Sequence, residues 1–271
     1  MPFTIVNVLL VADSGDGPRQ ALRLDGGDSQ LILPMGEVHV WRGSLERSPH
    51  SVERMRGVLA DDERSRADRF RFERDRSRYI VGRGLLRGLL ARYTGIAPQE
   101  LSFGYGEFDK PELEGGPWFN LSHSGSLALY AFSNVGEIGI DVEIDSADFA
   151  HERVAERFFS AAEVTVLRSL PAEMQARAFL TCWTRKEAFI KARGDGLSLA
   201  LDSFDVTLGP DVPAALLRTE WCRDEPGEWF MEDLSDRRAG YIAAVALRGE
   251  GSRVVERQIV DTIEGAMPGQ E

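Results

Sequence analysis

The spacing of apolar and polar residues divides the chain into short strands and longer helices. Alternating positions, or short apolar runs bounded by turn residues, predict strands near 38–41, 127–132, 138–144, 204–208 and 241–247. Apolar residues at helical spacing predict helices over 79–93 and 177–193, each followed by a glycine, Gly95 or Gly194. A strand pair with helices therefore occurs in each half of the chain, although no repeat is evident from the sequence alone.

Two further helices are predicted from their start signals. Asp61 or Asp62 can cap a helix that runs through the arginine-rich stretch that follows. Ser160 and Glu163 fit a capping box, in which each side chain accepts a hydrogen bond from the backbone of the other residue. Residues 13–30, rich in Gly, Asp and Ser, are interpreted as a loop or flexible segment, so we expect ordered structure to begin near Glu37.

The composition is that of an ordinary globular protein with one large or two small domains, since 43% of the 271 residues are hydrophobic and 28% are charged. No apolar run approaches the ~20 residues that cross a bilayer, and residues 1–12 lack the basic flank and cleavage site of a signal peptide. Cys182 and Cys222 have no paired spacing. We therefore expect a cytoplasmic protein with buried, reduced thiols and no membrane partner.

Charge is distributed unevenly along the chain. The formal net charge of −12 argues against a general nucleic-acid binder. Between Asp61 and Arg92, however, ten arginines face six acids, a local charge of +4 that leaves −16 for the rest. These arginines form either a solvated helical face or a surface for a polyanionic small molecule, with bidentate contacts to phosphate.

The strand predicted at 138–144 carries its acids on one face. Because side chains alternate, Asp141, Glu143 and Asp145 point to one side and the isoleucines and valine of the strand point to a core. Same-face neighbours are ~6.6 Å apart, so Asp141 and Glu143 can converge on one ion. The alternative is a half-exposed strand with its acids in water.

The helix predicted over 177–193 supplies a third carboxylate beside lysines. Its apolar side carries Phe179, Leu180, Trp183, Phe189 and Ile190, and another face carries Glu187 and Lys191 one turn apart. The chain contains only three lysines, Lys110, Lys186 and Lys191, among 32 basic residues. Three carboxylates beside lysines can hold a divalent metal against a phosphate, whereas Glu187 and Lys191 alone would form an ordinary surface ion pair.

His123 is a further candidate for the binding of phosphate. It lies between two serines where a loop enters a strand, and it is either a structural histidine or a donor to a phosphate. The sequence contains no Ser-His-Asp order, no C-x-x-C pair and no G-x-x-x-x-G-K-[ST] loop. Spacing and charge alone therefore lead to a metal–phosphate site without a defined reaction.

Four blocks taken in order resemble the Sfp-type 4′-phosphopantetheinyl transferases: Phe119–Gly125, Ile138–Glu143, Phe158–Glu163 and Trp183–Leu197. The resemblance covers roughly residues 38–247 and rests most on W-T-R-K-E-A-F-I-K-A-R-G-D-G-L-S after G-I-D-V-E. It implies an α+β fold of two similar halves, related by a pseudo-twofold, with the ligand in the cleft between them. The expected division is an N-terminal extension at 1–36 and halves at 37–136 and 137–271.

The resemblance also implies the reaction. A 4′-phosphopantetheinyl transferase moves the arm of coenzyme A to a serine of an apo acyl or peptidyl carrier protein and releases adenosine 3′,5′-bisphosphate. By motif position, Mg²⁺, with Mn²⁺ as an alternative, would be held on the coenzyme A pyrophosphate by Asp141, Glu143 and Glu187. We further predict that Glu187, directly or through a metal-bound water, accepts the proton of the carrier serine.

The remaining implied contacts belong to the coenzyme A phosphates. Lys191 would neutralise charge on the pyrophosphate and leaving group, with Lys186 in the same pocket. His123, helped by Arg78, would meet the 3′-phosphate. Arg66 and Lys110 would border the nucleotide, Lys110 from a D-K-P turn similar to the family's G-K-P.

Two other functions use parts of the same pattern. A nucleotide pyrophosphohydrolase needs the three carboxylates but no carrier protein, and a non-catalytic module that binds coenzyme A or a carrier would not need all three. The acidic charge of the chain makes contact with a carrier local and partly apolar. We expect a monomer, because both halves of the cleft lie in one chain, and the carriers could serve fatty-acid, polyketide or nonribosomal-peptide synthesis.

Overall fold

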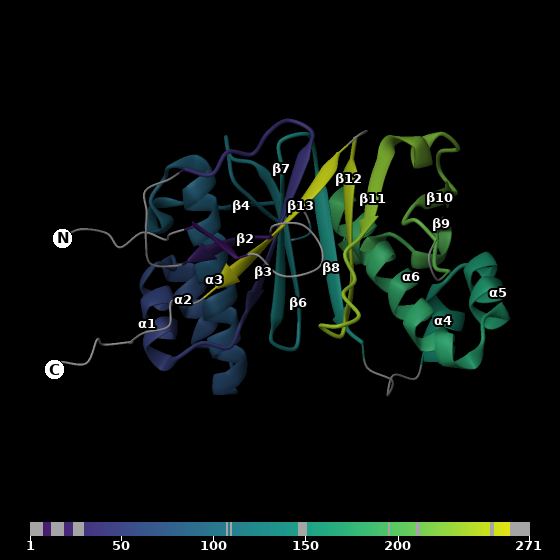
Figure 1. The fold of residues 1–271 in the computed structure, drawn as a ribbon, viewed down its shortest axis with the longest axis horizontal. Coiled ribbons are helices and arrows are strands. Elements are labelled where there is room, and N and C mark those ends of the chain that lie inside the picture. Colours follow the sequence, from purple (N-terminus) through teal and green to yellow (C-terminus); the bar gives the residue numbers. More distant parts are fainter. Residues whose placement is uncertain are drawn as a thin grey trace. The chain divides into compact units, whose positions relative to one another are not determined.

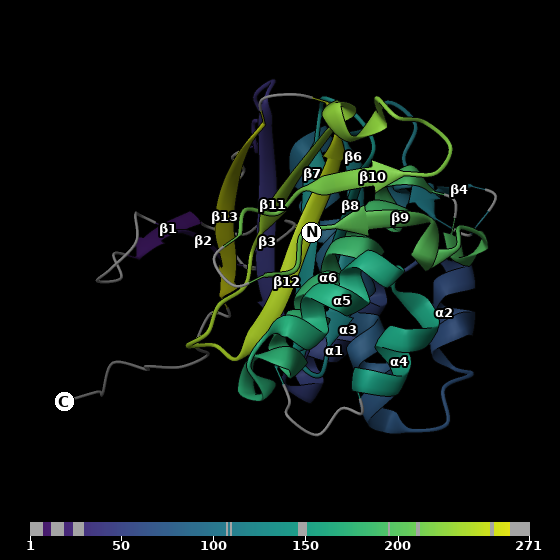
Figure 2. The ribbon, with the colours of Figure 1, turned by 90° about the vertical axis from the view of Figure 1, so that its right-hand side faces the viewer.

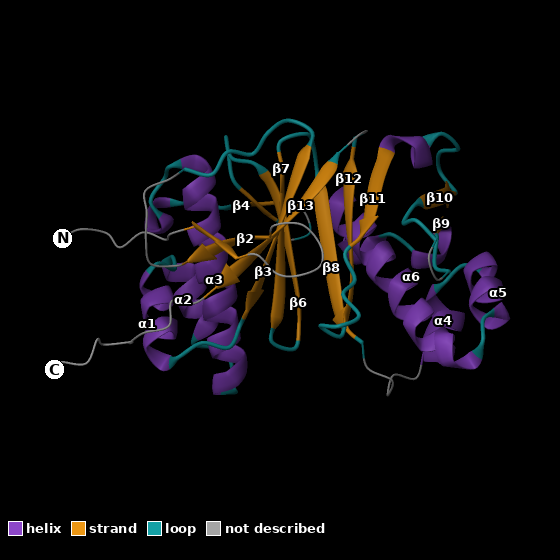
Figure 3. Ribbon diagram, viewed as in Figure 1, coloured by secondary structure: helices purple, strands orange, loops and turns teal. Residues whose placement is uncertain are grey.

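The computed structural model describes residues 8–11, 19–23, 30–106, 108, 110–145, 151–194, 196–209, 212–249 and 252–260. They form a mixed α+β protein (Figure 3), which confirms the expected class. The chain divides into two compact units. The first comprises residues 1–32, 41–100 and 256–271, and the second comprises residues 33–40 and 101–255.

Each unit contains one 22-residue helix. The first unit holds α1 (Pro49–Gly57), α2 (Asp61–Ala67) and α3 (Glu73–Thr94). It also holds β1 (Val8–Val11) and β2 (Arg19–Arg23), which pair antiparallel. The strand β13 (Arg253–Val260) begins in the second unit, ends in the first and pairs parallel with β2. The strand β3 (Glu37–Ser44) begins in the second unit and ends in the first. Strand β2 therefore lies within the stretch that composition assigned to a loop, and two strands precede Glu37.

The long helix α3 begins six residues before the predicted start. Residues 73–78 are all polar, so they add no apolar period, whereas the predicted core side of Ile80, Leu85, Leu86, Leu89 and Leu90 is buried. The helix ends where predicted, because Gly95 adopts the left-handed conformation with φ 77°. The arginine-rich stretch is not one helix, since α2 ends at Ala67 and α3 begins at Glu73, and the N-cap of α2 is Ala60 instead of an aspartate.

The second unit is built around a three-stranded antiparallel sheet and the helix α6 (Ala172–Arg193). The sheet order is β11 (Trp229–Asp233), β12 (Tyr241–Arg248) and β8 (Ile138–Ile144). Helix α6 lies along β8 and β12, with α4 (His151–Phe158) and α5 (Ala161–Ser169) on its far side (Figure 1). The predicted bounds of β8 are confirmed, and α6 begins five residues earlier than predicted.

A hairpin and several shorter strands complete the second unit. Strands β6 (Trp118–Ser124) and β7 (Leu127–Ser133) pair antiparallel through Gly125, whose φ of 58° suits a tight turn. The two-residue strands β4 (Gly104–Tyr105) and β5 (Pro111–Glu112) also pair. Strands β9 (Phe204–Val206) and β10 (Leu216–Thr219) form a separate ribbon, seen beside α5 and α6 in Figure 2.

The start of α5 confirms the capping box. Ser160 Oγ accepts from Glu163 N, and Glu163 accepts from Ser160 N. Both cysteines are free thiols as predicted, but Cys222 is exposed and only Cys182 is buried. Over the described part of the chain, no helix combines the length and hydrophobicity that a membrane crossing requires.

Candidate functional site

The acid-bearing face of β8 is covered by α6, and Gly139 makes this close packing possible. A Cβ at Gly139 would lie 2.1 Å from the Ala188 carbonyl oxygen and 2.3 Å from Ala192 N. Because Gly139 and Asp141 share a face of the strand, the same contact brings the last turns of α6 over Asp141. The acids of β8 therefore do not lie on a solvated strand face, and Asp141 is only 4% exposed.

Asp141 is the centre of a polar cluster. Its Oδ1 accepts a hydrogen bond from Ser122 Oγ at 2.8 Å and from Lys191 Nζ at 2.6 Å. The same ammonium lies 3.2 Å from Ser122 Oγ and 3.3 Å from the Ile140 carbonyl oxygen. The other carboxylate oxygen, Asp141 Oδ2, is buried and has no hydrogen-bond partner among the described residues. An unpartnered buried carboxylate oxygen costs free energy unless a ligand satisfies it.

The two glutamates that the sequence placed beside Asp141 share its electrostatic environment. Burial raises the pKa of Glu143, and the negative charge of Asp141 raises it further, against the opposing effects of Ser124, Lys191 and His123. Burial also raises the pKa of Glu187, and Asp141 and Glu143 add to the rise while Lys191 opposes it. The three carboxylates therefore repel one another at close quarters, which a bound cation would relieve.

The described residues nevertheless contain no group of three acid, histidine or cysteine side chains that is already assembled around a metal position. Lys191 occupies Asp141 Oδ1, and Ser124 Oγ donates to Glu143 Oε2 at 2.8 Å. A metal held by all three acids would require their carboxylates to draw closer together. Their all-oxygen donor set is the kind that Mg²⁺ and Mn²⁺ prefer.

A pocket of about 190 Å³ opens beside these acids. Its lining combines apolar side chains, two lysines and two glycines: Phe108, Lys110, Asn120, Leu121, Glu187, Ile190, Lys191, Gly194 and Gly196. Lys110 donates to the carbonyl oxygens of Lys191 and Ala192 at 2.7 and 3.1 Å, so it caps the C-terminal end of α6. Burial lowers the pKa of Lys110. Three of the predicted site residues, Lys110, Glu187 and Lys191, line this one pocket, whereas the capping of α6 by Lys110 was not predicted.

Lys186 does not lie in this pocket, which corrects the role that the resemblance implied. Its side chain is fully buried on a different side of α6 and pairs with Glu163 at 2.8 Å. It also donates to the carbonyl oxygens of Leu201 and Phe204 and lies 4.2 Å from the centre of the Phe204 ring. One helical position rotates a side chain by about 100°, so Lys186 faces α5 and β9 while Glu187 faces the pocket.

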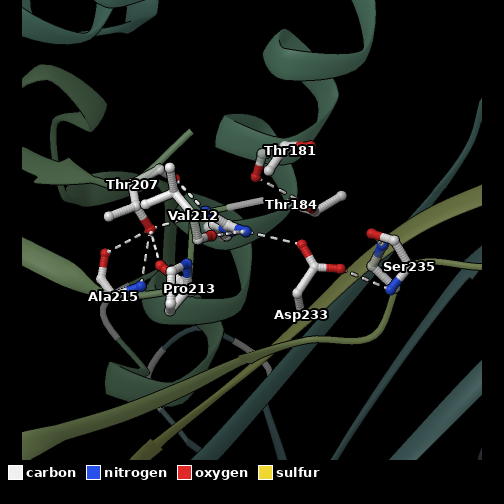
Figure 4. A network of polar contacts seen from close by, with 10 residues as sticks. Thr181, Thr184, Thr207, Val212, Pro213, Ala215, Asp233 and Ser235 are labelled. Carbon is white, nitrogen blue, oxygen red and sulfur yellow. Dashed lines mark hydrogen bonds and ion pairs between the residues drawn. The ribbon is translucent and has the colours of Figure 1, made fainter. Parts of the chain in front are cut away.

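Arg185 forms a second buried network that sequence analysis did not identify. It donates to the Thr207 carbonyl and hydroxyl oxygens at 2.7 and 2.8 Å and pairs with Asp233 at 2.8 Å. Figure 4 shows the surrounding contacts of Thr207 with Pro213 and Ala215, and of Asp233 with Ser235. Arg185 follows Cys182 by three positions and precedes Phe189 by four, and this spacing on the buried side was the available signal.

The predicted phosphate-binding residues lie in different units. His123 is exposed on β6 in the second unit, the unit that also contains the three acids. Arg66 and Arg78 belong to the first unit, where Arg66 lies over the Tyr79 ring and Arg78 pairs with Glu46 at 3.1 Å. Arg66 is exposed and Arg78 is half-buried. Their contacts with a nucleotide stay predictions.

Two family models match the chain. Residues 137–246 match the 4′-phosphopantetheinyl transferase superfamily, and residues 43–134 match the family described as 4′-phosphopantetheinyl transferase, N-terminal. The two matches meet at the turn that follows β7. Together they cover every residue singled out in the sequence as a candidate site residue.

Relatives with established names agree with these matches. The chain is 38% identical over 226 residues to the 4′-phosphopantetheinyl transferase HetI of Nostoc sp.. This match covers 82% of this chain and 92% of the relative. It is 35% identical over 166 residues to the 4′-phosphopantetheinyl transferase Sfp of Bacillus subtilis, a match that covers 60% of this chain and 73% of that relative. Among solved structures, a holo-[acyl-carrier-protein] synthase of Thermotoga maritima matches with a TM-score of 0.33 and 20% identity, over 43% of this chain and 64% of that one.

Proposed function

The chain belongs to the 4′-phosphopantetheinyl transferase superfamily, and we propose that it performs the transfer with Mg²⁺ held by Asp141, Glu143 and Glu187. It is an enzyme of this class, which uses coenzyme A as substrate and transfers the phosphopantetheine arm to carrier proteins. The acceptor is a serine of an apo acyl or peptidyl carrier protein, and the released product is adenosine 3′,5′-bisphosphate.

The observation that carries the metal proposal is the environment of Asp141. One of its oxygens is bound by Ser122 and Lys191, and the other is buried without a partner among the described residues. Burial raises the pKa of Glu143 and Glu187, and the negative charge of the neighbouring acids adds to the rise, which supports a cation at the same place. When bound there, Mg²⁺ supplies charge neutralisation for the pyrophosphate and the leaving phosphate.

Lys191 supplies the positive charge that the chain itself contributes to the reacting phosphates. Its ammonium is fixed over Asp141 by three contacts, and its carbonyl is held by Lys110. A fixed ammonium stabilises charge that develops in the transition state without reorganising. We assign Lys191 to the pyrophosphate and the leaving group.

Glu187 is suited to accept the proton of the carrier serine. It lines the pocket and is half-buried, so it can face the carrier serine directly or through a metal-bound water, and in the metal-free protein burial raises its pKa. We expect Glu187→Gln to bind Mg²⁺ more weakly, because Glu187 is also a proposed ligand, and to lose most turnover even at Mg²⁺ and coenzyme A concentrations that saturate the variant, measured by single-turnover mass spectrometry of the carrier. Near-normal turnover in a variant that binds both would contradict this role.

The other contacts complete the proposed substrate site. His123 and Arg78 meet the 3′-phosphate, and Arg66 and Lys110 border the nucleotide. Lys110 would do so with the ammonium hydrogen that does not bond α6. We propose that the enzyme acts in the cytoplasm as a monomer, with Mn²⁺ able to replace Mg²⁺, and that it serves fatty-acid, polyketide or nonribosomal-peptide carriers.

Intact mass of purified apo carrier proteins tests the proposal. Incubation with this protein, coenzyme A and Mg²⁺ should add the mass of one phosphopantetheine arm, and EDTA or Asp141→Ala should abolish the gain. Asp145→Ala is the matched control, because Asp145 lies on the same strand face but is exposed and pairs with Arg177. We expect this variant to keep its activity.

Each alternative has its own signature in this experiment. A mass gain that persists in EDTA would contradict the metal proposal. Release of phosphate products from nucleotides without a carrier would indicate a pyrophosphohydrolase. No gain on fatty-acid, polyketide or peptide carriers, despite binding of coenzyme A, would indicate a non-catalytic binding module.

A further inference from the structure

Three polar side chains on one face of β6 all bond to β8. Asn120, Ser122 and Ser124 alternate along β6 and so share a face. Asn120 Oδ1 accepts from Ile140 N at 3.0 Å. Ser122 Oγ donates to Asp141 Oδ1 and Ser124 Oγ donates to Glu143 Oε2, both at 2.8 Å. We call these three residues the polar ladder.

We propose that the polar ladder positions the two metal-binding acids of β8, with Ser122 orienting Asp141 and Ser124 orienting Glu143. The inference rests on the metal site proposed above and extends it to residues that would not touch the metal. Each hydroxyl bonds a single oxygen of its carboxylate. At Asp141 this leaves Oδ2 buried and without a hydrogen-bond partner in the described structure, as a metal ligand requires.

The spacing of the two chain segments explains why one serine serves each acid. In each serine–acid pair the acid follows the serine by 19 residues, so successive serines on one face of β6 bond successive acids on one face of β8. Asn120 holds the start of this register at Ile140 N, and Ser124 Oγ holds its end by accepting from Ile144 N at 3.2 Å. Side chains of β6 therefore fix β8 on both sides of the two acids.

Orienting a carboxylate matters because a free glutamate side chain loses rotamer freedom when it binds a metal. A hydrogen bond that already restricts the side chain reduces this cost, and removing such an outer contact lowers metal affinity by about 10- to 100-fold. Glu143 is half-buried and lies near the open end of β8, so it has more freedom to lose than Asp141.

The two serines are separate from the histidine between them. His123 alternates to the opposite face of β6 and is exposed, whereas Ser122 is buried. Ser122 also lies 3.2 Å from Lys191 Nζ, so a change there disturbs two groups. In the contacts described, the Ser124 hydroxyl bonds only Glu143 and one backbone amide. A change at Ser124 therefore disturbs fewer groups of the site than a change at Ser122.

The test measures Mg²⁺ affinity of the full chain with coenzyme A present, by isothermal titration calorimetry. We expect Ser124→Ala to weaken Mg²⁺ binding by about 10- to 100-fold and Ser124→Thr, which keeps the hydroxyl, to restore most of it. Ser133→Ala is the matched control, because Ser133 lies on the neighbouring strand β7 and, in the contacts described, its hydroxyl bonds the Val135 amide and no acid. It should leave Mg²⁺ affinity unchanged whatever it does to the melting temperature.

The outcomes separate the ladder from the metal site. If Asp141→Asn abolishes Mg²⁺ binding while Ser124→Ala and Ser122→Ala bind like the wild type, the ladder proposal is wrong and the metal site stands. If Asp141→Asn binds Mg²⁺ like the wild type, or the wild type does not bind it, both are wrong. An equal loss of affinity in Ser124→Ala, Ser124→Thr and Ser133→Ala would show a general effect on folding and would also overturn the ladder.

Discussion

Two lysines of α6, five positions apart, have different surroundings. Lys186 is fully buried, with Glu163 and two carbonyl oxygens as partners. Lys191 is half-buried and lies between Asp141 and the pocket. We therefore infer that Lys186 stabilises the fold, whereas Lys191 is the lysine that we propose for the reaction.

Replacing each lysine by methionine should separate these roles. Lys186→Met leaves Glu163 buried and unpaired, so we expect a loss of about 3–5 kcal/mol in the free energy of unfolding. Lys191→Met should lose turnover and also some stability, because it leaves the buried Asp141 without its cation. This stability loss should be the smaller of the two, since Lys191 itself is partly exposed to water. Urea unfolding measures the change in stability, and the mass of the carrier measures turnover. A Lys186→Met variant that keeps its stability but loses turnover would contradict the structural role and support a role for Lys186 in substrate binding.

The raised pKa values of Glu143 and Glu187 predict how Mg²⁺ binding depends on pH. The pKa of each group is raised above the ordinary value of 4.5, mainly by burial. The charge of Asp141 adds to the rise and Lys191 opposes it. A metal binds the deprotonated carboxylates, so affinity should increase as pH rises through the raised values and then level off. Calorimetric titrations from about pH 5 to about pH 8 measure this, and an affinity that falls with rising pH would contradict it.

At the scale of elements, the site depends on how closely α6 approaches β8. Gly139 lies beneath the backbone of residues 188 and 192, where a Cβ has no room. The partners across β12 are also small, since Gly139 pairs with Ala246 and Asp141 with Ala244. This close approach places Lys191 over Asp141.

Gly139→Ala should therefore move α6 away from β8. The added methyl group must displace backbone, so we expect a loss of at least about 1–3 kcal/mol in stability and a loss of Mg²⁺ affinity. Gly88→Ala in α3 is the matched control, because its Cβ meets nothing within 4 Å and a helix gains about 0.5–1 kcal/mol from alanine. Normal Mg²⁺ affinity in Gly139→Ala would show that the packing does not set the site.

The sequence predicted those elements whose apolar pattern is uninterrupted. It located β8 correctly and the ends of α3 and α6 to within a residue, because a glycine follows each helix. It placed the starts of both helices too late, because none of residues 73–78 and 172–176 is buried and so they add nothing to the apolar pattern. The partner of Lys186 could not be found locally, since Glu163 lies 23 positions away on another helix. The ladder was missed because it depends on the register between β6 and β8.

At the scale of the molecule, the compact units and the sequence halves do not coincide. The two family matches meet between residues 134 and 137, where the sequence analysis also placed its boundary. Strands β6 and β7 precede that point but belong to the same compact unit as β8 and α6. The polar ladder bonds β6 to β8, and Leu129 and Ala131 of β7 pack in one buried apolar cluster with the core side of β8. His123, Ser122 and the three acids thus belong to one unit.

The most direct test of the account is the position of a metal ion in crystals of this protein grown with coenzyme A and Mn²⁺. Manganese prefers the same oxygen ligands as Mg²⁺ and can be located by its anomalous scattering. We predict one strong peak bound by Asp141, Glu143 and Glu187 beside the pyrophosphate, with Ser122 and Ser124 still bonded to the two acids of β8. Coenzyme A bound with no peak among these three carboxylates, or with the metal held by other residues, would contradict it.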